Sequence, residues 1–444
     1  MGDDAHANGS GFRRRHPMIR ARMTRQRPIL APDREARGRR SENSKPYAYL
    51  RLFLAFSGNS TLRAGMQSRA RSGTSEMSPA QQAGPVRVLV ATPTGSEGQG
   101  GIDRLYFYLR QVIAQRGLDG VDIRYFAARG PAEGRRSMLA FPARMLRFAW
   151  VLATGGIDIV HLNHSTHGSV YRKAVLALVA GIFGKRIVIH FHGMVTPKDQ
   201  AAQPFWYKLL GWMARDADRI VVLGRAFAPF FSRTLGAAPE RIAVIPNGIP
   251  DFAPGIVTPK APDGEPPLIL FAGEVGLRKG ADLLLDALAK LETMTPDWRC
   301  VMAGNGEVNV FRSHAARLGL EHKVAFTGWV DSAAVHALMR EAAIVVLPSR
   351  VEGLPLTLLE GACAGTALVA SDVGAITDIV DDGVTGAIVA LEPQHIAARL
   401  AELLLSPDRL GRAQVEARRA FEQHYEIGRF ADHLRGLYLE IAAR

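Results

Sequence analysis

Residues 343–370 read AIVVLPSRVEGLPLTLLEGACAGTALVA and determine the class of fold. Apolar runs of strand length stand at both ends, Ala343–Leu347 and Ala367–Ala370, and their aliphatic residues are typical of buried strands. Pro355 stands between them, at a place where it suits the first turn of a helix. A strand, a helix and a second strand in this order form the repeating unit of a parallel α/β sheet.

The same alternation extends in both directions along the chain. Further strand-like runs are Arg87–Ala91, Ile157–Leu162, Arg186–His190, Arg219–Val222, Ala243–Ile245, Leu268–Ala272, Arg299–Ala303 and Val324–Thr327. The proline-rich stretch Pro246–Pro267 divides them into two series and predicts a linker. We therefore expect two α/β domains, residues 85–255 and 256–424, and a C-terminal helix at about 425–444 that packs back on the first. Ligands would bind beyond the carboxyl ends of the strands.

Charge is distributed unevenly along the chain. The formal net charge is +13 at pH 7, but residues 1–84 alone hold 16 lysines and arginines against 6 acids, a net of +10. Their composition, rich in Arg, Ser, Gly and Pro, predicts a disordered basic leader that adds nothing to the fold, and Met77 would be a natural start. The rest of the chain is nearly balanced and lacks the long basic face of nucleic-acid-binding proteins.

Two further features narrow the class of protein. No apolar run approaches the ~20 residues of a membrane-spanning helix. The two cysteines, Cys300 and Cys363, are too few for a disulfide framework or a cysteine-based metal site. Both stand in apolar runs, as small core residues do in a reducing compartment. These features favour a cytoplasmic protein.

Two loops directly after predicted strands suit anions. Gly98–Arg104 (GQGGIDR) opens a helix, and its glycines allow a phosphate or sugar to approach the backbone, although a tight turn would explain them equally well. Gly273–Gly280 (GEVGLRKG) precedes the predicted helix Ala281–Leu291. There Arg278 and Lys279 place two cations at a helix N-terminus, whose free N–H groups attract anions. A solvated loop is the alternative.

The segment after the strand Ala343–Leu347 carries two acids, Glu352 and Glu360. Gly353 and Leu354 present free N–H groups just ahead of the predicted helix. Carboxylates beside an anion site are unfavourable unless they accept hydrogen bonds from hydroxyl groups. A nucleotide-sugar meets both requirements, because its diphosphate suits the cations and N–H groups while its diols suit the acids.

Histidines near strand ends raise the alternative of a metal site. They are His161, His164, His167, His190 and His192. No carboxylate or cysteine partner is visible beside them, and an imidazole there can instead bond a sugar hydroxyl. Asp216 and Asp218 match the Asp-x-Asp pattern of metal-dependent transferases, but they end a helix directly before a strand. We therefore expect neither a metal nor a cofactor.

Taken together, these residues resemble the retaining glycosyltransferases of family 4, which have the GT-B fold. The resemblance covers roughly residues 86–440, and its signature is the Glu-x7-Glu motif at Glu352 and Glu360. The runs IPNGI at Ile245–Ile249 and FTGWV at Phe326–Val330 are also similar to the family. The resemblance implies two Rossmann-like domains whose parallel sheets face a central cleft, and transfer of a hexose from a nucleotide-sugar.

The resemblance also implies a role for each site residue. Lys279 would neutralise the diphosphate, which Gly100 and Gly101 would face. Glu352 and the Gly353 and Leu354 amides would hold the donor sugar, and His192 would contact its 6-hydroxyl. Glu360 would hold the ribose, and Val330 would lie near the base. The chain departs from the family at Glu274, where Arg is common, and Arg278 would supply that cation. Gly374-Ala375 replaces a Gly-Gly pair, and Asp378 replaces a Glu.

Other functions and the acceptor stay open at this point. A nucleotide-sugar epimerase and a silent scaffold of a polysaccharide assembly complex share the fold. Basic and aromatic residues alternate between Arg135 and Trp150, which suits either an interfacial helix at the inner membrane face or an ordinary surface helix. Arg172-Lys173 and the serines before it resemble transferases of surface-polysaccharide assembly, whose acceptors are lipid-linked sugars.

Overall fold

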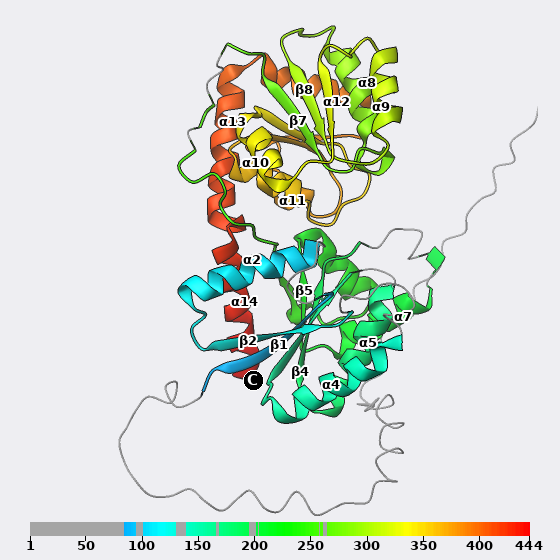
Figure 1. Ribbon diagram of the computed structural model, residues 1–444, viewed down its shortest axis with the longest axis vertical. Helices are drawn as coiled ribbons and strands as arrows, with labels where there is room; N and C mark the ends of the chain where they lie inside the picture. Colours follow the sequence, from blue (N-terminus) through cyan, green and yellow to red (C-terminus); the bar gives the residue numbers. More distant parts are fainter. Residues whose placement is uncertain are drawn as a thin grey trace, which may run out of the picture. The chain divides into compact units, whose positions relative to one another are not determined.

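The computed structural model of the chain describes residues 84–94, 101–129, 139–165, 168–194, 201–202, 204–256, 258–260 and 264–444. The predicted leader therefore lies almost entirely outside the described residues. A first parallel sheet has six strands in the order β2-β1-β3-β4-β5-β6 (Figure 1). Its strands are β1 (Val86–Thr92), β2 (Val121–Ala127), β3 (Ile159–His164), β4 (Arg186–Phe191), β5 (Arg219–Val222) and β6 (Ile242–Val244).

Helices cover both faces of this first sheet. They are α2 (Gly101–Arg116), α4 (Phe141–Thr154), α5 (Gly168–Ile182), α7 (Phe205–Asp216) and α14 (Ile427–Ala442). The buried side chains of α4, α5 and α7 form one core with the sheet, while those of α2 and the C-terminal α14 form a second core. Arg116 of α2 also bonds Asp432 of α14 at 2.8 Å. The last helix of the chain thus packs on the first sheet.

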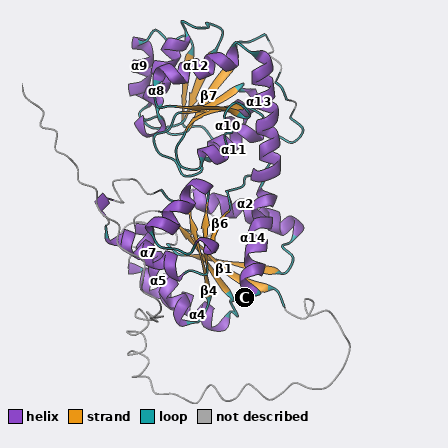
Figure 2. Ribbon diagram, turned by 180° about the vertical axis from the view of Figure 1, so that it is seen from behind, coloured by secondary structure: helices purple, strands orange, loops and turns teal. Residues whose placement is uncertain are grey.

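A second parallel sheet follows in the chain, with six strands in the order β12-β11-β10-β7-β8-β9. Its strands are β7 (Leu268–Ala272), β8 (Arg299–Ala303), β9 (Val324–Gly328), β10 (Ile344–Leu347), β11 (Ala367–Ser371) and β12 (Gly386–Val389). Its helices are α8 (Ala281–Leu291), α9 (Val308–Arg317), α10 (Ser332–Glu341), α11 (Leu356–Cys363), α12 (Pro393–Leu404) and α13 (Pro407–Ala420). Figure 2 shows helices on both sides of the strands.

The sequence pattern explains most of these elements. Every residue of β7 and β10 is buried, because helices cover both faces, and such strands are continuous apolar runs. The sequence did not predict β2 and β12, each of which is one of the two edge strands of its sheet. In β2, charged residues alternate with apolar ones, and β12 is short and begins at a glycine. An edge strand has one paired neighbour and can form with less apolar surface, which explains the weak signal of these two, whereas the edge strands β6 and β9 were predicted.

The strand order changes direction once in each sheet. In the first sheet, β1 lies between β2 and β3, and in the second, β7 lies between β8 and β10. In open α/β sheets, ligands bind beyond the carboxyl ends of the strands at such a point. The expected α/β architecture with parallel sheets is confirmed, and the two crossover points locate where binding residues should gather.

Candidate active site

Lys279 lies at the crossover point of the second sheet. The chain leaves β7 at Ala272 and makes a short turn over Leu277–Lys279 before α8 begins. Gly280 has φ +76°, and a Cβ built there would lie 2.0 Å from the Pro348 carbonyl oxygen. Only glycine permits this approach, which holds the Lys279 turn against the segment that follows β10.

Glu352 meets Lys279 in a buried ion pair. Lys279 Nζ lies 2.6 Å from Glu352 Oε1, and the exposed fractions of the two side chains are 12% and 8%. Ser349 Oγ donates a second hydrogen bond, 2.7 Å long, to the same carboxylate oxygen. A charged hydrogen bond at this distance is strong. The structure therefore brings together two predicted site residues that are far apart in the sequence.

The loop of Gly353 and Leu354 is fixed from behind by the segment after β11. Ala375 N donates to Gly353 O at 2.8 Å. Gly374 has φ +63°, and a Cβ built there would lie 2.2 Å from Glu352 O, so this glycine cannot be replaced without moving the loop. Within the described residues, neither Gly353 N nor Leu354 N donates a hydrogen bond. Both N–H groups are thus available to a ligand.

His192 directly follows β4 and lies beside Gly353. A Cβ built on Gly353 would be 3.7 Å from His192 O. His192 Nε2 lies 2.8 Å from Asn163 Oδ1, and Asn163 Nδ2 faces Ala91 O at 3.5 Å. A carbonyl only accepts, so this orientation makes His192 Nε2 the donor and leaves Nδ1 as an acceptor. Burial, aided by the nearby His164 and Lys173, lowers the pKa of His192 to about 3, so its ring is neutral.

Glu360 lies in α11 and has only loose ionic contacts. Arg104 Nη2 and His336 Nε2 each lie 3.9 Å from Glu360 Oε1. Arg104, from α2, is held by hydrogen bonds to Tyr108 Oη at 2.7 Å and Ser332 Oγ at 3.0 Å. The Glu360 carboxylate therefore retains the capacity to accept hydrogen bonds from a ligand.

The other predicted site residues are less closely grouped. Arg278 forms an ion pair with Glu274 at 2.9 Å, and both side chains are exposed. Glu274 stands where the family often has Arg, and it pairs with the arginine that was expected to replace that cation. Val330 lies between β9 and α10 and packs against the core of the second sheet. Gly101 opens α2, whereas Gly100 lies outside the described residues.

His161 and the second aspartate of the Asp-x-Asp pattern take part in structural hydrogen bonds. His161 bonds Tyr438 Oη through Nδ1 at 2.7 Å and Tyr106 Oη through Nε2 at 3.1 Å. Asp218 accepts from Ile187 N at 2.8 Å and from Arg186 at 3.0 Å. The part of the chain that the structure describes holds no group of three or more metal-ligating side chains. His167 lies outside it.

Sequence reasoning assigned no role to three residues that contact the predicted site. Arg104 and His336 lie beside Glu360, and Asn163 bonds His192. Arg104 belongs to the glycine-rich loop GQGGIDR, which was one available signal. Asn163 stands between two histidines in an otherwise apolar strand, and a buried amide there indicates a hydrogen-bond partner.

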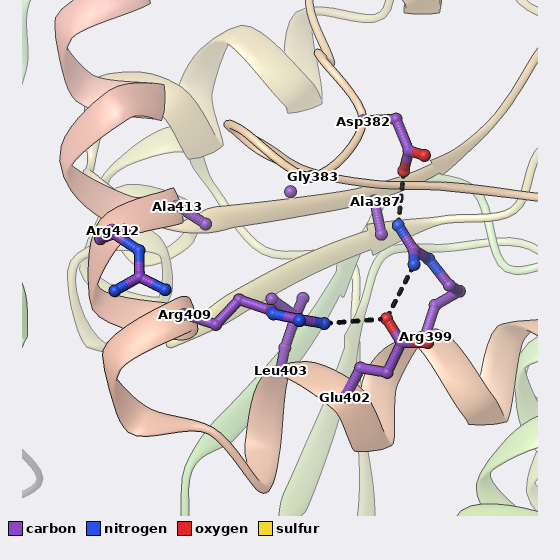
Figure 3. Close-up of a pocket in the computed structure, with 10 residues that line it drawn as sticks. Asp382, Gly383, Ala387, Arg399, Glu402, Leu403, Arg409, Arg412 and Ala413 are labelled. Atoms are coloured by element: carbon purple, nitrogen blue, oxygen red, sulfur yellow. Dashed lines mark hydrogen bonds and ion pairs between the residues drawn. The ribbon is translucent and has the colours of Figure 1, made fainter.

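A hollow of about 410 Å³ lies away from these residues, between β12, α12 and α13. Figure 3 shows Arg399 between Asp382 and Glu402, with bonds of 2.6 and 2.7 Å. Arg409 also bonds Glu402, at 3.3 Å. These acids neutralise two of the three arginines that line the hollow.

Comparison with known proteins identifies the family. Residues 256–421 match the model of "Glycosyl transferases group 1", and residues 70–248 match the "Glycosyl transferase 4-like domain". The phosphatidyl-myo-inositol mannosyltransferase of Mycobacterium tuberculosis is 30% identical over 72% of this chain and 84% of its own length. The D-inositol 3-phosphate glycosyltransferase 1 of Catenulispora acidiphila is 31% identical over 64% of this chain and 72% of its own.

Solved structures give the same fold. The Anabaena protein HepE, crystallised with UDP, superposes with a TM-score of 0.61 at 18% identity, over 80% of this chain and 100% of its own. The fold and the sequence matches together define a GT-B transferase. The chain belongs to the glycosyltransferases of family 4, and the resemblance seen in its sequence is confirmed.

Proposed function

We propose that the chain transfers a hexose, with retention of configuration, from a nucleotide-sugar to an acceptor in polysaccharide or glycolipid biosynthesis. One observation carries this proposal. Lys279, Glu352 and the free N–H groups of Gly353 and Leu354 gather at the crossover point of the second sheet, beside His192. HepE, which has the same fold, was crystallised with UDP, and this supports a nucleotide as part of the donor.

Charge at the leaving group accounts for the chemistry. As the bond between sugar and diphosphate breaks, negative charge grows on the departing phosphate oxygen. Lys279 and the amides meet that charge, and preorganised groups of this kind are a main catalytic device in enzymes. The acceptor hydroxyl attacks the anomeric carbon on the face that the diphosphate leaves, and the departing phosphate oxygen takes the hydroxyl proton. Glu352 and the neutral His192 hold the sugar hydroxyls.

The countercharge in this scheme comes from protein groups, so we propose metal-independent turnover. The full chain is incubated with a panel of UDP-, GDP- and ADP-hexoses, with and without EDTA, and release of nucleoside diphosphate is measured. We expect release with one donor class and equal rates in EDTA. Loss in EDTA with rescue by a divalent cation would contradict metal independence.

The same panel separates the competing functions. An epimerase would convert the donor without releasing nucleoside diphosphate, and a silent scaffold would do neither. The fold is common to all three, so only product analysis distinguishes them. Steady release of nucleoside diphosphate that increases with an added acceptor supports transfer.

An apolar face on the first domain supports a membrane-bound acceptor. Exposed side chains from three neighbouring helices form it: Leu146 and Trp150 of α4, Tyr171, Val175, Leu178 and Ile182 of α5, and Phe205 of α7. Those of α5 recur every three or four residues, as one stripe does. Neither α4 nor α5 contains an acidic residue, and α4 also contains Arg144 and Arg147. An apolar face with cations and without acids suits an anionic lipid surface.

We propose that this apolar face docks on the inner surface of the cytoplasmic membrane, where a lipid-linked saccharide is the acceptor. None of the described helices is long and apolar enough to cross a bilayer. The predicted basic–aromatic segment contributes through α4, whereas Arg135 and Arg136 lie outside the described residues.

We expect the full chain to bind phosphatidylglycerol vesicles and to bind them more weakly as salt rises, since screening weakens the attraction. Leu178→Glu, in the middle of the α5 stripe, should reduce binding at least tenfold. Leu405→Glu is the matched control, because Leu405 is also exposed but belongs to the second domain. Vesicle co-sedimentation measures both. Salt-insensitive or absent binding would favour a soluble acceptor and an ordinary surface helix.

A further inference from the structure

The turn that carries Lys279 is short and weakly bonded. It is a single 3₁₀ turn, Leu277–Lys279, with a glycine on each side. The backbone hydrogen bonds that close it are 3.1 to 3.3 Å long, and its Leu277 side chain is exposed rather than packed. Such turns have poorer hydrogen-bond geometry than an α-helix. The position of the Lys279 ammonium group therefore depends on contacts from outside the turn.

Arg350, in the segment after β10, supplies such contacts through its backbone and its side chain. Arg350 N donates to Arg278 O at 2.9 Å, and a guanidinium nitrogen donates to Leu277 O. The same guanidinium donates a pair of hydrogen bonds to the two carboxylate oxygens of Asp282, at 2.8 and 2.7 Å. Asp282 lies in the first turn of α8. Arg350 therefore joins the start of the turn to the helix that follows it, with Lys279 between the two points of contact.

The ion pair of Arg350 with Asp282 contributes geometry to the site rather than charge. The two opposite charges neutralise each other at 2.7 Å, so this arginine differs from Lys279 in its task. A guanidinium that forms two hydrogen bonds with one carboxylate is fixed in direction as well as in distance. The carbonyl of Leu277, bonded to the same guanidinium, is held in that fixed frame.

The residue before Arg350 fixes the other member of the Lys279–Glu352 pair. Ser349 Oγ donates to Glu352 Oε1 at 2.7 Å, and Ser349 O accepts from Ser371 Oγ, at the end of β11, at 2.5 Å. Both serines are buried. Two consecutive residues thus act on the two sides of the ion pair, Ser349 on the carboxylate and Arg350 on the turn that carries the ammonium group.

We propose that Arg350 is a positioning residue, which holds the Lys279 ammonium group at the place where charge develops on the leaving phosphate. This inference deepens the proposed function and rests on it, because Lys279 meets that charge only in the proposed transfer. A catalytic group misplaced by about 1 Å can lower a rate by about a hundredfold. Loss of Arg350 therefore lowers turnover through Lys279, without any contact between Arg350 and the donor.

A double-mutant cycle between Arg350 and Lys279 tests this role. Turnover and KM of the full chain are measured for Arg350→Ala, Lys279→Ala and the double variant, with the donor identified in the panel. We expect Arg350→Ala alone to lower turnover about tenfold and to change the donor KM by less than about threefold. In the Lys279→Ala background the same substitution should change turnover by less than about twofold, because no ammonium group remains to be positioned. Effects that multiply would overturn the inference.

Two further variants separate positioning from charge and from general stability. Arg350→Lys keeps the charge, but one ammonium group cannot reproduce the paired hydrogen bonds and the bond to the turn together, so turnover should stay at least about threefold below the wild type. Full turnover in Arg350→Lys would contradict positioning by geometry. Arg299→Ala is the matched control, because Arg299 also bonds a backbone carbonyl, that of Pro266, and a carboxylate, that of Glu341, away from the site. Its turnover should equal that of the wild type, and thermal melts show that each variant is folded.

Hydrogen exchange supplies a measurement that needs no donor. Mass spectrometry of the full chain follows the peptide that covers residues 276–284. Its amides should exchange at least about tenfold faster in Arg350→Ala and at the wild-type rate in Arg299→Ala. Unchanged exchange in Arg350→Ala would overturn the inference. If the wild type releases no nucleoside diphosphate from any donor, the proposed function fails, and the exchange still decides whether Arg350 holds the turn.

Discussion

Lys279→Ala is expected to lower turnover by about a hundredfold or more while donor binding changes far less. The negative charge that Lys279 meets is small in the bound donor and grows as the glycosidic bond breaks. An interaction that strengthens toward the transition state affects the rate more than it affects binding. Steady-state kinetics with the donor identified in the panel measures both quantities.

The structure adds a stability effect to this variant. Lys279 pairs with the buried Glu352, so its removal leaves a buried carboxylate with only the Ser349 hydroxyl as a partner. Breaking a buried pair from one side costs about 3–5 kcal/mol. We therefore include the double variant Lys279→Ala/Glu352→Gln, which removes the unpaired charge. Its thermal melt should return toward that of the wild type, and its turnover should stay low.

Glu360→Gln is the matched comparison within the site. Ribose hydroxyls change little during the reaction, and the amide retains the shape and part of the hydrogen bonding. We expect donor binding to weaken by roughly 1–3 kcal/mol with turnover nearly unchanged. If Lys279→Ala instead leaves turnover within a few-fold of the wild type, Arg278 serves the phosphate or the site lies elsewhere.

Acid should begin to destabilise the protein at a pH above the range in which carboxylates titrate. Burial lowers the pKa of His161 and His164 from 6.5 to about 3, and that of His190 well below its ordinary value. Between about pH 6.5 and 3, the unfolded chain therefore binds protons that the folded chain excludes. Stability then falls as the pH falls, by up to about 1.4 kcal/mol per pH unit for each histidine.

Urea unfolding at pH 7, 6 and 5 measures this slope. His164→Leu removes an imidazole whose nitrogens have no hydrogen-bond partner among the described residues. The change in unfolding free energy per pH unit should therefore decrease by about the contribution of one histidine. His322→Gln is the control, because the His322 side chain is 88% exposed and its loss should leave the slope unchanged. The pKa values of Asp251 and Asp282 are lowered from 3.8, so the contribution of these acids to stability changes below about pH 5, outside the range of the urea series. A flat stability between pH 7 and 5 would contradict the prediction.

Local pattern was enough to predict much of the fold. The predicted strand Leu268–Ala272 and helix Ala281–Leu291 have the observed bounds, because apolar runs, helical spacing and glycine breaks act over a few neighbouring residues. The order of the strands within each sheet, and the edge strands β2 and β12, depend on which runs pair. Pairing is decided by burial across the whole domain, which no short window records.

The features of the candidate site also fall into two groups, those that the sequence predicted and those that only the structure shows. The sequence by itself determined which residue types follow the strand ends, and hence the turn at Lys279, which we propose binds an anion, and the acids at Glu352 and Glu360. Only the tertiary structure decided that Lys279 pairs with Glu352, that Arg278 pairs with Glu274, and that Asn163 orients His192. The distance between two charged side chains is set by the packing of sheets and helices. The sequence therefore shows which residues are charged, but only the fold determines which opposite charge lies close enough to pair with each.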